Sequence, residues 1–113
     1  MYYIKIISLE GCPYSISAEN LLTNMKIKHN LIRIKYNDCD KYITDDIQTF
    51  PQIYLKKNNS KGSLLLGGYD DLKYSIDLFK GQKLNDNNIN NFMKKYNWSK
   101  KSVLRLIELY NIK

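Results

Sequence analysis

A run of β-branched and aromatic residues near the N-terminus is followed closely by Gly-Cys-Pro. This combination constrains the fold of the chain more than any other feature. Residues 2–7, YYIKII, have the composition of a buried strand. Downstream, apolar residues recur at the spacing of one helical face: Ala18, Leu21, Leu22 and Met25. Pro13 suits the first turn of that helix, where its missing N–H needs no partner. Cys12 is therefore predicted to lie between the end of a strand and the start of a helix.

This position of Cys12 favours thiol chemistry, although a buried structural cysteine is the alternative. The first turn of a helix presents unpaired N–H groups and the positive end of the helix dipole, which favour a thiolate. The carboxyl ends of strands are also where α/β folds bind ligands. Ser15 follows one helical turn later and can donate a hydrogen bond to the Cys12 sulfur, but it cannot form a disulfide. Any redox cycle must therefore end with an external thiol.

Composition narrows the class of protein. The chain has 113 residues, of which 43% are hydrophobic and 26% charged, as expected for one globular domain. The two cysteines are too few for a disulfide scaffold. Because no run of about 18 apolar residues and no signal-peptide pattern is present, we expect a cytoplasmic protein with no membrane partner. The net charge of +7 comes mostly from scattered Lys, which argues against a nucleic-acid partner.

The remaining patterns give the order β-α-β-α-β-β-α. Three more strands are predicted, over residues 31–36, 52–57 and 63–66. Between residues 37 and 49, Ile43 and Ile47 make one weak helical face, which predicts a short helix. A stronger helix is predicted from residue 70 or 71 to a stop at Gly81.

The last thirty residues are predicted to add a helical extension to this core. Residues 82–91 are polar and Asn-rich, so we expect a loop. Ser99 is a suitable N-cap for a final helix with one apolar stripe: Val103, Leu106, Ile107 and Tyr110. We therefore expect a single domain over residues 1–113, with a core of about 1–81 and an extension of about 85–113 that packs on the sheet.

Two further segments have backbones suited to ligand binding, and each also has a simpler explanation. Pro51 directly precedes a strand; a trans bond is usual there, whereas a cis bond would expose the N–H and C=O of Phe50 to an extended peptide. Residues 67–71, GGYDD, begin a helix whose N–H groups can bind a carboxylate. The two Asp residues can equally serve as helix caps.

Taken together, the three segments resemble those of the glutaredoxin family. CPYS is similar to the family's CPYC motif with the second cysteine replaced, TFPQIYL is similar to its cis-proline segment, and GGYDDL is similar to its Gly-Gly-x-Asp segment. Their order and spacing agree over roughly residues 1–81. The resemblance implies an α/β, thioredoxin-like fold with a four-stranded mixed sheet flanked by helices.

The resemblance also implies a glutathione site with Cys12 as the nucleophile. Ser15 would modulate the thiol without taking a covalent part. The implied glutathione-binding residues come from all three segments: Tyr14, Thr49, Phe50, Pro51, Gly68, Tyr69 and Asp70. In this arrangement the Phe50 backbone pairs with the cysteinyl part of glutathione, and Tyr69 N–H and Asp70 hold the γ-glutamyl end. Thr49, with Gln48 beside it, would lie near the glycine end.

The sequence departs from the family at one important place. The family usually has a Lys three residues before the cysteine, where this chain has Leu9, and the neighbouring Glu10 disfavours a thiolate. Lys5 or Lys35 would have to supply the missing positive charge. Cys39, flanked by two Asp residues, has no counterpart among the family's functional cysteines and is predicted to be a bystander.

Three functions are compatible with these residues. The first is a monomeric, monothiol oxidoreductase that uses glutathione to reduce glutathionylated proteins or small mixed disulfides, with no bound metal. The second is a carrier in which two chains hold a [2Fe–2S] cluster through Cys12 and glutathione, although the CGFS motif of that branch is absent. The third is a redox-inactive binding module on the same fold.

Overall fold

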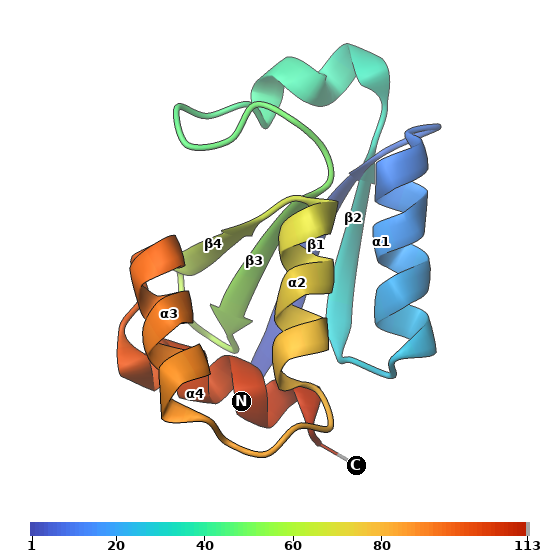
Figure 1. Ribbon diagram of the computed structural model, residues 1–113. Helices are drawn as coiled ribbons and strands as arrows, with labels where there is room; N and C mark the ends of the chain where they lie inside the picture. Colours follow the sequence, from blue (N-terminus) through green and yellow to red (C-terminus); the bar gives the residue numbers. More distant parts are fainter. Residues whose placement is uncertain (113) are drawn as a thin grey trace.

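The fold is built around the strand β1 (Tyr2–Leu9), in which Ile4 and Ile6 are fully buried. The structure is a computed structural model and describes residues 1–112. The other strands are β2 (His29–Ile34), β3 (Gln52–Lys57) and β4 (Ser63–Gly67). In the sheet order β2-β1-β3-β4, β1 is parallel to β2, while β3 is antiparallel to both of its neighbours (Figure 1). This is the mixed sheet that the sequence predicts.

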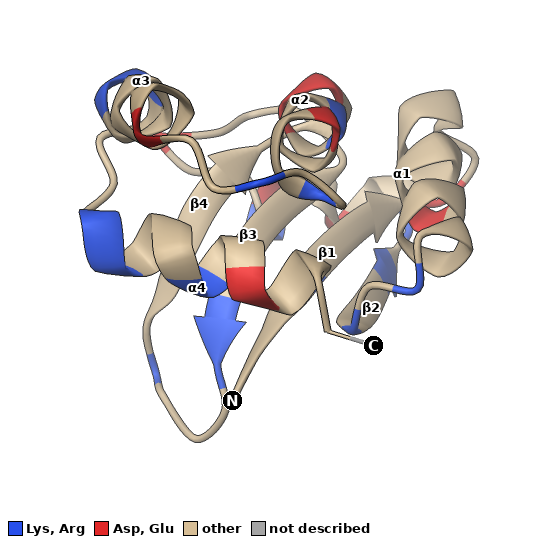
Figure 2. Cartoon of the chain, turned by 60° about the horizontal axis from the view of Figure 1, so that its bottom comes forward, with Lys and Arg blue, Asp and Glu red and all other residues tan. Residues whose placement is uncertain are grey.

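Four α-helices accompany the sheet, and a buried core joins them to it. They are α1 (Pro13–Asn24), α2 (Tyr69–Phe79), α3 (Asp86–Tyr96) and α4 (Lys100–Tyr110). Helices α1, α2 and α3 lie side by side over one face, and α4 crosses the end of the sheet where β1 begins (Figures 1 and 2). Leu22, Leu72, Phe92 and Leu106 are fully buried between these layers. No helix within residues 1–112 has the length and apolar content needed to span a bilayer.

Helix α3 corrects the prediction of a loop over residues 82–91. Its N-cap is Asn85, whose side chain accepts the Asn88 N–H at 3.1 Å, and it ends at Asn97 in the left-handed conformation. Ile89 and Phe92 bury one face of the helix. The asparagines thus lie on the solvent-exposed face of the helix and at its two ends, while apolar residues cover the buried face.

The C-terminal extension packs into the same core as the rest of the chain. The indole N–H of Trp98 donates to the Leu65 carbonyl of β4 at 3.1 Å. The Tyr110 hydroxyl and the Ser75 hydroxyl of α2 are 2.7 Å apart in a buried contact. Lys80 also donates to the Tyr110 carbonyl at 2.8 Å. These contacts agree with the expectation that the extension packs on the sheet.

The segment between β2 and β3 differs from the predicted short helix. A 3₁₀ helix, η1 (Tyr36–Lys41), follows β2 directly, and the chain then turns without further helix. Ile43 is 39% exposed, so it forms no packed helical face. Instead, the Thr44 hydroxyl accepts the N–H of Asp46 and of Ile47, a local turn that competes with helix formation. Strand β2 also lies two residues earlier than predicted.

Candidate active site

Cys12 lies where the sequence predicts, at the junction of β1 and α1. It is the N-cap of α1, and the first intrahelical hydrogen bond runs from the Ile16 N–H to the Cys12 carbonyl at 3.1 Å. The N–H groups before Ile16 are therefore directed at the region of the thiol without an intrahelical partner. The half-buried thiol donates to the Phe50 carbonyl at 3.8 Å. The cysteine thus contacts the segment before β3, which is distant in sequence.

A cavity of about 350 Å³ is lined by seven of the residues that the resemblance assigns to glutathione binding, together with Asp71. Its lining is Tyr14, Thr49, Phe50, Pro51, Gly68, Tyr69, Asp70 and Asp71. The rings of Tyr14 and Tyr69 flank it, with centroids 6.3 Å apart. Three segments far apart in sequence therefore meet at one concave surface beside Cys12. Gln48, which the resemblance placed near the glycine end, does not line it.

The backbone at this cavity leaves hydrogen-bonding groups free for a ligand. The Phe50–Pro51 peptide bond is cis, as the resemblance implies, and no group within residues 1–112 pairs with the Phe50 N–H. In α2 the first intrahelical bond runs from the Leu72 N–H to the Gly68 carbonyl at 3.1 Å. The N–H groups of Tyr69 and Asp70 precede that bond, and such helix starts bind carboxylates.

Comparison with known proteins gives one informative result. No protein-family profile and no curated protein sequence matches the chain. A crystal structure of glutaredoxin 1 from Francisella tularensis, complexed with cacodylate, superposes with a TM-score of 0.54 and 24% sequence identity. The match covers 68% of this chain and 94% of that glutaredoxin. This chain has a glutaredoxin fold. About a third of it lies outside the matched part.

Asp71, for which the sequence predicts only a possible role as a helix cap, connects two helices of this glutaredoxin fold. One of its carboxylate oxygens accepts the Gly68 N–H at 3.0 Å, and the other accepts the Tyr96 hydroxyl at 2.8 Å. Burial, together with the hydrogen bond to Asp71, raises the pKa of Tyr96 well above its usual value, so the phenol remains a donor. Helix α3 therefore supports the start of α2. Asp70, which is exposed, keeps its carboxylate available to a ligand.

Ser15 makes a different contact from the predicted one. Its buried hydroxyl oxygen accepts the Leu9 N–H at 3.0 Å, whereas no hydrogen bond joins it to the Cys12 sulfur within residues 1–112. This hydrogen bond thus links the end of β1, just before the turn that carries the cysteine, to the first turn of α1. A cysteine sulfur at this position would be a weaker acceptor for that N–H.

Lys35 lines a cavity together with Glu10, one of the two residues at which the sequence departs from the family. A separate shallow cavity of about 400 Å³ is lined by Glu10, Gly11 and Lys35, together with Tyr36 and Asn37. Lys5 instead lies 5.6 Å from the centroid of the Tyr54 ring, a residue of β3. Of the two candidate lysines, only Lys35 therefore flanks the loop that carries Cys12.

Cys39 does not line the cavity beside Cys12. Cys39 lies in η1, and its thiol contacts the Asp40 carboxylate at 3.8 Å. Both cysteines are free thiols. Within residues 1–112, no group of three or more His, Cys, Asp or Glu side chains is arranged to hold a metal ion.

Substitution of Gly67 by alanine is expected to disturb the start of α2. Gly67 has φ +137°, and an added Cβ would clash with the Asp71 carboxylate that caps the helix. We expect Gly67→Ala to lower the free energy of unfolding by about 1–3 kcal/mol, measured by urea denaturation. Gly62→Ala is the matched control, because a Cβ there would meet nothing within 4 Å. Equal stability of the two variants would contradict this account of Gly67.

Proposed function

We propose that this chain is a glutathione-dependent thiol-disulfide oxidoreductase that reduces glutathione mixed disulfides by a monothiol mechanism. Its substrates would be glutathionylated proteins or small glutathione-containing disulfides. The proposal rests on one observation: a cavity beside Cys12 is lined by all seven residues that the sequence assigns to glutathione. The glutaredoxin fold is consistent with that chemistry.

The free groups of the cavity are complementary to the parts of glutathione. The unpaired Phe50 N–H is suited to main-chain pairing with the cysteinyl unit. The Tyr69 and Asp70 N–H groups suit the α-carboxylate of the γ-glutamyl unit, and the Asp70 side chain suits its ammonium group. The Thr49 hydroxyl is available to the glycine end. No Lys or Arg among residues 1–112 lines the cavity, so recognition of glutathione would depend on these neutral and acidic groups.

The reaction needs only Cys12 and a second glutathione. The Cys12 thiolate attacks the glutathione sulfur of the mixed disulfide, the old S–S bond breaks, and the substrate leaves as a thiolate that takes up a proton. The thiolate of a second glutathione then attacks the glutathione sulfur bound to Cys12. Oxidised glutathione leaves, and the Cys12 thiolate is regenerated. Ser15 takes no covalent part in either step.

A coupled assay tests the proposal directly. Purified protein is mixed with glutathione, a small glutathione mixed disulfide, glutathione reductase and NADPH, and the oxidation of NADPH is followed. We expect turnover that requires glutathione and the protein together. A redox-inactive binding module would give only the rate without protein, and that result would overturn the proposal.

Asp70 tests the assignment of the γ-glutamyl end. We expect Asp70→Asn to raise KM for glutathione about tenfold with little change in kcat, because it removes a charge-assisted contact made in binding. Asp77→Asn is the matched control on the same helix, since Asp77 pairs with Lys73 at 3.0 Å and does not line the cavity. If both variants had the same KM as the unsubstituted chain, Asp70 would not bind the ligand.

A further inference from the structure

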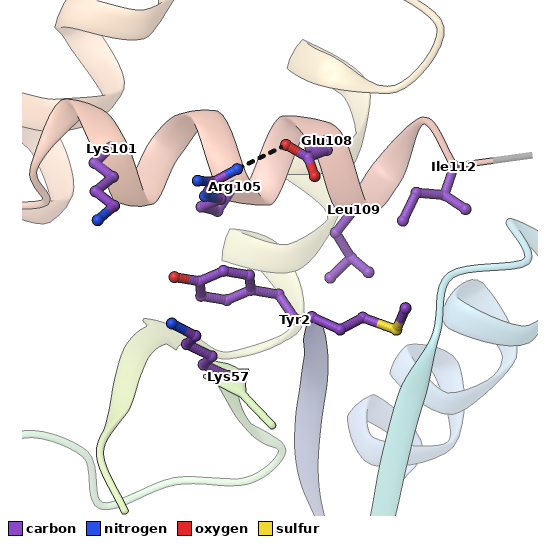
Figure 3. A pocket seen from close by; sticks show the side chains of 8 residues that line it. Tyr2, Lys57, Lys101, Arg105, Glu108, Leu109 and Ile112 are labelled. Carbon is purple, nitrogen blue, oxygen red and sulfur yellow. Dashed lines mark hydrogen bonds and ion pairs between the residues drawn. The ribbon is translucent and has the colours of Figure 1, made fainter. Parts of the chain in front are cut away.

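A second cavity, of about 440 Å³, lies at the opposite end of the sheet from Cys12 (Figure 3). It is formed by Tyr2 at the start of β1, Lys57 at the end of β3, and residues of α4. Cys12 follows the other end of β1. At about 3.3 Å per residue, the length of β1 separates the two sites by roughly 20–25 Å. The second cavity is therefore independent of the thiol and its glutathione site.

Three cationic side chains from two elements converge on this cavity. Lys57 comes from β3, whereas Lys101 and Arg105 lie one turn apart on α4. Lys57 extends from β3 on one side of Tyr2 and Lys101 and Arg105 extend from α4 on the other, with the guanidinium carbon of Arg105 6.0 Å from the Tyr2 ring centroid (Figure 3). Figure 2 shows the same basic segments at the end of β3 and along α4. Three cationic side chains and Tyr2 thus line the same cavity.

Cationic side chains outnumber carboxylates among the described residues that line the cavity. Among residues 1–112, the only carboxylate side chain that lines it is that of Glu108, which pairs with Arg105 at 3.1 Å. Lys57 and Lys101 form no ion pair within residues 1–112. Three cations against one carboxylate leave a positive potential, which a concave surface focuses. The arrangement is suited to a ligand that carries more than one negative charge.

The remaining residues that line the cavity indicate that the ligand also has an organic part. Leu109 and Ile112 give the cavity an apolar side, and the Tyr2 ring is a flat surface beside it. A smaller adjoining cavity of about 210 Å³ shares Tyr2 and Lys57, and the serines at positions 60, 63 and 102 line it. Hydroxyl groups there can pair with polar substituents. The larger volume is within the range of about 300–1,000 Å³ that small-molecule sites occupy.

We propose that this cavity binds a phosphorylated small molecule. The phosphate would lie between Lys57, Lys101 and Arg105, because a guanidinium and two ammonium groups match its dianionic charge and its several acceptor oxygens. The organic part would lie against Tyr2 and Leu109. A single carboxylate would leave part of the positive charge unmatched, so phosphate fits better than the carboxylates of glutathione.

Binding of adenosine 5′-monophosphate, inorganic phosphate, pyrophosphate and adenosine to the full chain tests this proposal. Titrations are followed by amide chemical shifts at constant ionic strength. We expect the phosphorylated probes to bind and to shift the amides of Tyr2, Lys57 and Lys101, whereas adenosine binds much more weakly. Failure of every phosphorylated probe to bind, or equal binding of adenosine, would overturn the proposal.

Adjacent lysines on α4 provide a matched pair of variants. We expect Lys101→Gln to weaken binding of adenosine 5′-monophosphate about tenfold, whereas Lys100→Gln leaves it unchanged because Lys100 does not line the cavity. Both side chains are exposed, so neither substitution threatens folding. Equal weakening would indicate general attraction to a basic protein and would overturn the proposal. The Cys12→Ser variant should retain binding of adenosine 5′-monophosphate. Failure of this proposal can therefore be distinguished from failure of the proposed oxidoreductase function.

Discussion

Replacement of Cys12 by serine is expected to reduce glutathione-dependent disulfide reduction at least about a hundredfold, to the rate without protein. A serine hydroxyl cannot form the mixed disulfide with glutathione on which both steps depend. The side chain is half-buried and its main contact is the Phe50 carbonyl at 3.8 Å, so the substitution should leave the fold intact. The measurement is the coupled NADPH assay, with far-UV circular dichroism as the check on folding.

Cys39→Ser is the control for this prediction. Cys39 lies in η1, its thiol contacts the Asp40 carboxylate and it does not line the cavity beside Cys12, so we expect full activity. Mass spectrometry after treatment with oxidised glutathione gives a second readout, because the adduct should map to Cys12. Activity that survives in Cys12→Ser, or that disappears in Cys39→Ser, would contradict the assignment of the nucleophile.

Truncation of Phe92 is expected to cause the largest loss of stability. Phe92 is fully buried, and its ring centroid lies 4.4 Å from that of Tyr96, 5.2 Å from Phe79 and 5.4 Å from Trp98. We expect Phe92→Ala to lower the free energy of unfolding by about 3–5 kcal/mol. That is a large share of the roughly 5–15 kcal/mol typical of a domain. Urea denaturation followed by circular dichroism measures the effect.

Leu104→Ala is the matched control in the same extension. Leu104 is 37% exposed, so its truncation removes fewer buried contacts and should cost much less. If the two substitutions cost the same, the extension would be loosely attached rather than part of the core. We expect Phe92→Ala also to weaken glutathione binding, because Phe92 packs against Tyr96, which holds Asp71.

The sequence predicts the site better than it predicts the segments around it. Local signals, such as a proline after a cysteine and a glycine pair before two acids, predict the helix starts at Cys12 and Gly68, whereas the cis bond before Pro51 was implied only by the family resemblance. The fold then brings those segments together at one cavity, although Gln48 does not line it. The contact of Ser15 with the Leu9 N–H could not be predicted, because it depends on how the turn between them closes.

The polar composition of residues 82–91 led to the wrong prediction of a loop where α3 begins. Ile89, Phe92, Met93 and Tyr96 follow the i, i+3, i+4, i+7 spacing of a helical face. The surrounding asparagines suggested a loop, although in the structure they cap the helix or lie on its solvent side. At residues 37–49, in contrast, the spacing of two isoleucines predicted a helical face that the structure does not form. Ile43 is exposed, so the buried contacts that would stabilise such a helix are missing.

The hydrogen bond from Trp98 to β4 has a practical consequence for spectroscopy. Trp98 is the single tryptophan of the chain, it is 4% exposed, and its indole N–H is held by the Leu65 carbonyl. Its ring also lies 6.4 Å from that of Tyr96, the donor to Asp71. Intrinsic fluorescence of one residue therefore reports on the attachment of α3 and α4 to the sheet without any label. Its emission should shift to longer wavelength when that attachment is lost.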